Sequence, residues 1–127
     1  MHENDLARIV VDSAFKVHTS LGPGLLETVY QFALNHELNA RGISTHRERP
    51  IPVYYDEHKL EMGFRADIVV ANKVIIECKS VEALAPVHSK VLLTYLRLAD
   101  MRLGLLINFN VVLIKDGIRR VVNDLKE

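Results

Sequence analysis

The chain has 127 residues, which is the size of one domain and is long enough to bury a core without a disulfide or structural metal. Hydrophobic residues make up 49% of it and charged residues 25%, which is typical of a globular protein and excludes a disordered chain. Sixteen lysines and arginines balance sixteen aspartates and glutamates, so the net charge is zero. This balance excludes a basic protein that binds nucleic acid through bulk charge; only a local patch would hold such a partner.

The sequence also limits where the protein acts. Its single cysteine, Cys78, excludes a disulfide framework and a four-thiolate metal site within one chain. Residues 1–5 are polar and acidic, whereas a signal peptide begins with a basic and then an apolar segment. The longest apolar run, Leu103 to Phe109, has the length of a core strand and is far short of the roughly 18 residues of a membrane span. These features predict a cytoplasmic protein with no membrane partner.

Two helices are predicted first along the chain. Apolar residues keep helical spacing from about Asp5 to Ser20 and again from about Leu25 to Arg41. Gly22-Pro23-Gly24 separates the two segments, and Gly42 stands where a glycine commonly ends a helix. The first part of the chain is therefore expected to be a pair of helices joined by a sharp turn.

Three extended segments are predicted next. The first, from Ile43 to Tyr55, contains two prolines and is expected to be an edge or irregular strand. A turn at residues 56–59 separates it from a strand over Leu60 to Val70. The third strand, Val74 to Cys78, follows the turn Ala71-Asn72-Lys73, which predicts a hairpin.

The rest of the chain returns to the alternation of helix and strand. A third helix is predicted over Val87 to Asp100, and Leu103 to Phe109 is apolar at both parities, as a strand buried on both faces would be. The segments Val111–Ile114 and Ile118–Val122 are expected to form a closing hairpin. This order predicts one α/β domain over residues 1–127, with a mixed β-sheet flanked by helices.

The predicted hairpin around Asn72 brings charged residues together. Residues whose numbers sum to 144 should lie opposite each other, which places Asp67 across from Glu77. Alternation along the strand places Glu77 and Lys79 on one face and Cys78, a predicted core thiol, on the other. A pair of carboxylates at the end of a buried strand suits a hard cation such as Mg²⁺ or Mn²⁺. A surface hairpin whose charges are simply solvated is the alternative.

The second helix carries an acidic residue on its apolar side. At 100° per residue, Glu27 projects between Leu34 and Leu38, inside the stripe that should face the core. A carboxylate in such a place is rarely buried without a partner, which favours a functional role. The alternative is a first-turn glutamate that is stabilised by the helix dipole and leans into solvent.

Taken together, the motifs resemble one known family. Gly24-Leu25-Leu26-Glu27-Thr28-Val29-Tyr30 is similar to the motif that names the GxxExxY proteins, and the resemblance extends from about Ile9 to Val122. Further similar segments are Phe64-Arg65-Ala66-Asp67, Glu77 to Glu82, Leu84 to His88, Leu93 to Leu96, Leu103 to Asn110 and Gly117 to Arg120. The family is assigned to the PD-(D/E)XK nuclease-like superfamily, which implies a restriction-endonuclease-like αβββαβ core.

The resemblance also implies roles for individual residues. It makes Asp67 and Glu77 metal ligands, with Glu27 as a third ligand that binds directly or through water. Lys79 completes the E-x-K pair and would orient the attacking water and stabilise developing negative charge. These four residues form the expected catalytic set. Substrate-binding roles are expected for three further residues in the matching motifs, namely Tyr30, Tyr95 and His88.

One position departs from the family pattern. Members usually carry a glutamine four residues before the tyrosine of the third helix, where this chain has Val91 before Tyr95. In related nucleases this glutamine and tyrosine flank the site and help to place phosphate or water. Lys90 lies about 100° away around the helix and is not expected to replace the glutamine.

Two functions from different classes follow, with a third as the remaining option. The leading hypothesis is a Mg²⁺- or Mn²⁺-dependent nuclease that acts on DNA, with RNA as the other substrate and a homodimer expected by analogy. The alternative is a nuclease-like fold with weak or no catalysis that serves as a nucleic-acid or protein binding module. A purely structural protein is disfavoured, because it has no use for the self-repelling pair of Asp67 and Glu77.

Overall fold

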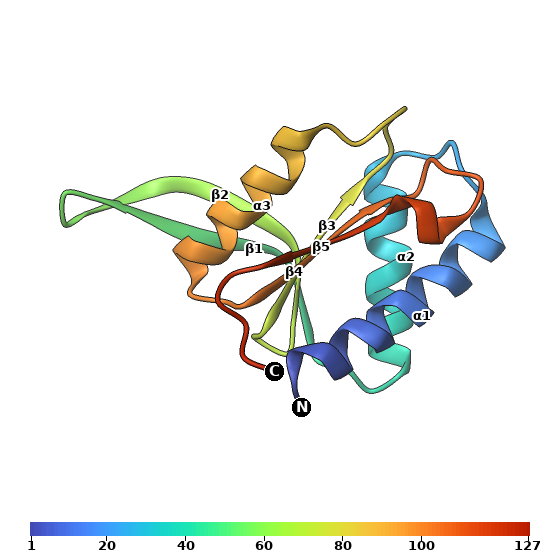
Figure 1. The fold of residues 1–127 in the computed structure, drawn as a ribbon, viewed down its shortest axis with the longest axis horizontal. Helices are drawn as coiled ribbons and strands as arrows, with labels where there is room; N and C mark the ends of the chain where they lie inside the picture. The colour runs from blue at the N-terminus through green and yellow to red at the C-terminus, as the bar shows by residue number, and fades with distance from the viewer.

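The computed structural model describes the backbone of all 127 residues and the side chains of residues 1–60 and 63–127. Five strands form one mixed sheet in the order β1-β2-β3-β4-β5. The helices α1 and α2 cover one face of this sheet and α3 covers the other (Figure 1). In chain order the elements are α1 (Glu3–Leu21), α2 (Glu27–Ala40), β1 (Thr45–Tyr55), β2 (His58–Val70), β3 (Val74–Lys79), α3 (Pro86–Ala99), β4 (Leu103–Asn108), the 3₁₀ helix η1 (Ile114–Gly117) and β5 (Ile118–Val122).

The two central strands are apolar on both faces because helices cover both faces. β3 and β4 are parallel, and all six residues of β4 are buried. Only Lys79, the last residue of β3, is partly exposed. The α/β architecture and the buried central strands predicted from the sequence are therefore confirmed.

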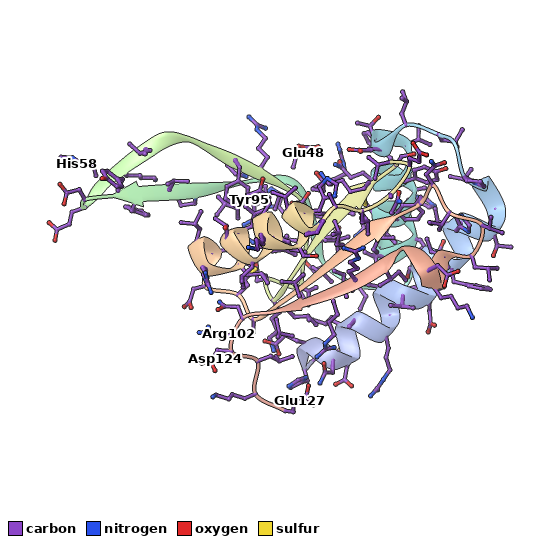
Figure 2. The ribbon with its side chains drawn as sticks, turned by 45° about the horizontal axis from the view of Figure 1, so that its top comes forward. Glu48, His58, Tyr95, Arg102, Asp124 and Glu127 are labelled. Atoms are coloured by element: carbon purple, nitrogen blue, oxygen red, sulfur yellow. The ribbon has the colours of Figure 1, made fainter. Side chains whose placement is uncertain are left out.

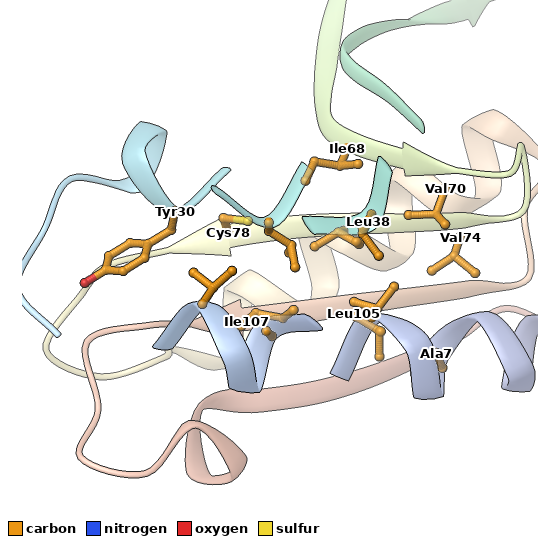
Figure 3. Close-up of a cluster of buried hydrophobic side chains, with 14 of the residues drawn as sticks. Ala7, Tyr30, Leu38, Ile68, Val70, Val74, Cys78, Leu105 and Ile107 are labelled. Carbon is orange, nitrogen blue, oxygen red and sulfur yellow. The ribbon is translucent and has the colours of Figure 1, made fainter. Parts of the chain in front are cut away.

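The sheet separates two cores. On one face, Ile76 and Cys78 of β3 pack with apolar residues of α1 and α2, such as Leu34 and Leu38 (Figure 3). On the other face, Ile75 packs with buried leucines of α3. Burying each such side chain contributes about 1.5–3 kcal/mol to folding. Because residues alternate along β3, Glu77 and Lys79 lie on the α3 side, and the prediction of Cys78 as a core thiol is confirmed.

The hairpin of β1 and β2 extends beyond the body of the domain as an arm (Figures 1 and 2). His58 lies near its tip, and β1 is the edge strand, as its prolines predict. The pairing of the two strands shifts register between Ile51 and Val53, close to Pro52. No helix among the residues whose side chains are described has both the length and the apolar character needed to cross a membrane.

The predicted closing hairpin is wrong. Residues 110–113 form bends, and the chain then enters η1 instead of a strand over Val111–Ile114. β5 pairs antiparallel with β4 directly, for example Ile107 with Ile118. The connection is compact because Ile114 is buried and because a side chain at Gly117 would overlap the carbonyl oxygen of Asn108. Of the apolar residues in this segment, Ile114 packs into the core, whereas Val112 and Leu113 are exposed, so their apolar character does not mark a strand.

Candidate active site

The register of β2 and β3 brings two acids together. The strands pair as Ile68↔Ile76, Val69↔Ile75 and Val70↔Val74, so each pair sums to 144 as predicted. The same register continued by one residue places Asp67 opposite Glu77. Asp67 also reaches across to β3, where its Oδ2 accepts a hydrogen bond from the backbone N–H of Cys78 at 2.8 Å. The sheet itself therefore holds the two carboxyl groups side by side.

Glu77 is the more unusual of the two acids. The residue is only 7% exposed. Its Oε1 is buried and has no hydrogen-bond partner among the described residues. Burial, reinforced by the neighbouring charge of Asp67, raises the pKa of Glu77 to about 9. Burial also raises the pKa of Asp67, although the N–H of Cys78 partly opposes this shift. Without a cation, loss of hydration and mutual repulsion both disfavour the ionised forms of these two carboxyl groups.

This donor set fits a divalent cation. An unpartnered buried carboxyl oxygen beside a second carboxylate offers the hard oxygen ligands that Mg²⁺ and Mn²⁺ prefer. A cation there would replace the repulsion between Asp67 and Glu77 with attraction and would favour the ionised form of each. The chemistry of the pair thus agrees with the predicted metal-binding role.

Lys79 lines the same cavity as Glu77. Both residues line a cavity of about 140 Å³ between the sheet and α3, which Val91, Tyr95 and His88 line from the helix side. The positive charge of Lys79 lowers the pKa of Asp67 and of Glu77, though less than burial raises them. A cavity of this size holds a few water molecules and is too small for a nucleotide. The cavity has room for a phosphate group and its associated waters beside Glu77.

Two predicted substrate-binding residues border this cavity. His88, in the first turn of α3, accepts a hydrogen bond at Nδ1 from the backbone N–H of Ala85 at 3.0 Å. The ring of Tyr95, about two turns farther along α3 and labelled in Figure 2, stacks on Phe64 with 3.5 Å between ring centroids and 11° between planes. Burial, followed by the negative charges of Glu77 and Asp67, raises the pKa of the Tyr95 hydroxyl. Both side chains therefore lie close to the acidic pair.

Tyr30 is placed differently from the other predicted substrate-binding residues. It is fully buried, and its ring stacks on Phe109 with 4.5 Å between centroids. Its hydroxyl donates to the carbonyl of Gly22 at 2.5 Å and accepts from the N–H of Leu25 at 3.1 Å. A contact with substrate is at odds with this burial. The structure instead gives Tyr30 the task of holding the turn between α1 and α2.

Glu27 lies at the same end of the sheet but apart from the acidic pair. It is exposed in the first turn of α2, which agrees with the alternative of a first-turn glutamate that leans into solvent. Its Oε2 accepts a hydrogen bond from the backbone N–H of Ser80 at 3.2 Å. Within the described part of the chain, no three His, Cys, Asp or Glu side chains are grouped to hold a metal ion. The third ligand predicted from the resemblance is thus not assembled with Asp67 and Glu77.

Sequence reasoning missed a third acid near Asp67. Glu48 has the left-handed backbone angle φ 54° and lies between the pairs Arg47↔Ile68 and Arg49↔Ala66, across from Asp67. Its Oε1 accepts from Nε2 of the buried Gln31 at 2.9 Å, and its charge raises the pKa of Asp67 slightly. Figure 2 shows Glu48 near the base of the arm. The turn of this hairpin does not reveal Glu48, because the pairs beside the turn, such as Tyr55↔His58, sum to 113. Only beyond the register shift between Ile51 and Val53 do the pairs sum to 115, which brings Glu48 across from Asp67.

The departure from the family pattern lies at the cavity. Val91 lines it together with Glu77 and Lys79, so a side chain at position 91 faces the site. Lys90 instead lines a different hollow together with Arg119 and Arg120. This placement agrees with the expectation that Lys90 does not replace the missing glutamine.

Comparisons with known proteins agree with this arrangement. A family model described as the PD-(D/E)XK nuclease superfamily matches residues 4–121. Neither the comparison with curated proteins nor the one with solved structures finds a match. The matched range includes the acidic pair, Lys79 and all of α3.

Proposed function

Because the chain belongs to the PD-(D/E)XK nuclease superfamily, we propose that it is a Mg²⁺- or Mn²⁺-dependent nuclease that hydrolyses phosphodiester bonds in DNA, with RNA as the other substrate. Its elements α2-β1-β2-β3-α3-β4 form the restriction-endonuclease-like αβββαβ core. Within the superfamily, the motif around Glu27 and Tyr30 supports a place among the GxxExxY proteins. A homodimer would provide the two active sites that cutting both strands requires.

The unpartnered Oε1 of Glu77 is the observation that carries this proposal. A buried carboxyl oxygen without a hydrogen bond is costly, and the neighbouring carboxyl of Asp67 adds to the cost. A protein selected only for stability would replace one of these acids with a neutral residue. Such an arrangement is expected where the acids serve a charged ligand.

In this proposal the acids and Lys79 have separate tasks. Asp67 and Glu77 would hold the cation, and Glu27 would contribute through a water molecule because it lies apart from the pair. The chemistry supplied by a cation held there is polarisation of the scissile phosphate and a lower pKa for an attacking water. Lys79, a compact point charge on the wall of the same cavity, would orient that water and stabilise negative charge developing on the phosphate.

A binding module with weak or no catalysis is the second candidate, and Val91 favours it. The residue presents an apolar surface where related nucleases carry an amide that helps to place phosphate or water. The acidic pair and Lys79 would then bind nucleic acid through a cation without efficient cleavage. The two candidates share the metal site and differ in turnover.

A cleavage assay with a matched variant tests the proposal. Single- and double-stranded DNA and RNA would be incubated with the parent protein and with Lys79→Ala, in Mg²⁺, in Mn²⁺ and in EDTA. The parent should cut at least one substrate with either cation and none in EDTA, and Lys79→Ala should cut none while still binding Mn²⁺, because an ammonium is not a ligand. Circular dichroism must show that the variant is folded. Binding of nucleic acid by a parent that cuts none of the substrates would support the binding module instead.

A further inference from the structure

The first turn of α3 fixes how His88 presents its ring to the cavity. Nδ1 accepts a hydrogen bond from the backbone N–H of Ala85 at 3.0 Å. A backbone amide nitrogen can only donate, so Nδ1 must carry a lone pair and no proton. The neutral ring therefore carries its proton on Nε2. The ring also lines the cavity of Glu77 and Lys79, and no described residue bonds to Nε2.

From this geometry we infer that His88 is a hydrogen-bond donor to the scissile phosphate through Nε2–H, and neither a metal ligand nor a general base. The inference rests on the proposed nuclease function and assigns a role to a residue at the same site. A metal ligand or a base needs a nitrogen with a free lone pair. In His88, the lone pair of Nδ1 is bound to Ala85, and Nε2 has a proton in place of a lone pair.

The helix cap alone does not require a histidine. Ala85 is the residue that precedes α3, and His88 is the third residue of the helix, which is where a glutamate or glutamine side chain usually accepts from the capping residue. Either of these side chains would satisfy the N–H of Ala85. A histidine does so with one nitrogen and leaves an N–H on the opposite edge of a rigid ring. This second edge suits a phosphate oxygen that enters a narrow cavity bordered by Lys79.

Two variants with side chains of equal shape, His88→Gln and His88→Glu, distinguish a hydrogen-bond donor from a metal ligand and from a residue that only caps the helix. Both side chains can accept from Ala85, so both variants should melt within a few degrees of the parent. Only glutamine offers an N–H donor, so His88→Gln should keep cleavage within about tenfold of the parent, whereas His88→Glu should lose about 100-fold. If His88 were a metal ligand, His88→Glu would cut and bind Mn²⁺ better than His88→Gln. If His88 only capped the helix, both variants would cut like the parent; either result would overturn the inference.

Nuclear magnetic resonance of the imidazole nitrogens gives a readout that does not depend on cleavage. The metal-free parent should show His88 with an unprotonated Nδ1 and a protonated Nε2, whereas the exposed His58 at the tip of the arm serves as a reference for a free ring. Dimethyl phosphate, the smallest phosphodiester, should shift the Nε2–H resonance of His88 and leave that of His58 in place. A proton on Nδ1, or no shift with dimethyl phosphate, would overturn the inference. If the parent cuts no nucleic acid, the nuclease proposal fails, and these two signals still decide whether His88 binds phosphate.

Discussion

The carboxylate of Asp67 on β2 accepts a hydrogen bond from the backbone N–H of Cys78 on β3, with 2.8 Å between oxygen and nitrogen. This hydrogen bond joins Asp67 of β2 to the residue that directly follows Glu77 on β3. The backbone of the sheet thus holds the two carboxyl groups together. Burial raises the pKa of both carboxyl groups, and the charge of Asp67 raises that of Glu77 further.

In the metal-free protein, the free energy of unfolding should fall as the pH rises toward 9. The pKa of Glu77 is about 9 in the folded chain, compared with 4.5 for the free side chain, so the folded state holds the proton more tightly between these values. The contribution is fully present below pH 4.5 and is lost as the pH rises through 9. The loss is at most about 1.4 kcal/mol per pH unit. Urea unfolding in EDTA at several pH values would measure it.

Glu77→Gln provides the control for this pH dependence. Glutamine does not titrate, so the variant should lose this slope and be more stable than the parent at the alkaline end of the range. Glu57→Gln, at the exposed turn of the arm, should keep the slope of the parent. Equal slopes in the parent and in Glu77→Gln would show that Glu77 does not carry the effect.

Asp67→Asn should raise the melting temperature in EDTA and abolish cleavage. The asparagine oxygen can still accept from Cys78, while the repulsion with Glu77 disappears. Mg²⁺ at five times its Kd should stabilise the parent by about 1 kcal/mol, a shift of roughly 3–6 °C. The variant should lose most of that shift. If Asp67→Asn melts lower than the parent in EDTA, the carboxylate is structural.

The hairpin around Asn72 explains why the acidic pair was predictable from sequence. A tight turn fixes which residues face each other, so the pairing of Asp67 with Glu77 followed from arithmetic, and the pairs from Ile68↔Ile76 to Val70↔Val74 obey the same sum. The turn between Tyr55 and His58 does not give Glu48 in the same way, because the register shift between Ile51 and Val53 changes which residues face each other farther along the hairpin. Tyr30 was not predictable in this way, because its partners Gly22 and Leu25 lie in an irregular turn whose path no periodicity describes.

Val91→Gln should raise the cleavage rate without raising stability. The new amide would enter the cavity of Glu77 and Lys79, where an additional polar group can place phosphate or water. Val87→Gln makes the same substitution one turn earlier on α3, at a position outside the cavity lining, and should leave the rate unchanged. A folded Val91→Gln that cuts no faster than the parent would show that Val91 does not limit activity.

Tyr30→Phe should reduce the free energy of unfolding by about 1–2 kcal/mol, because the carbonyl of Gly22 and the N–H of Leu25 lose their shared partner. Well below its melting temperature, the variant should cut nucleic acid like the parent, since the ring is fully buried. Chemical denaturation and cleavage assays on the same preparation would measure both effects. Parent-like stability with a large loss of cleavage would restore Tyr30 as a substrate-binding residue.

Anomalous diffraction from crystals soaked in Mn²⁺ tests the metal site most directly. The parent should show one strong peak within bonding distance of both Asp67 and Oε1 of Glu77, the oxygen that has no partner among the described residues. Crystals of Asp67→Asn soaked in the same way should lack this peak, while Glu57→Gln crystals should retain it. If Mn²⁺ at saturating concentration leaves the space between Asp67 and Glu77 empty in the parent, the two acids do not form a metal centre.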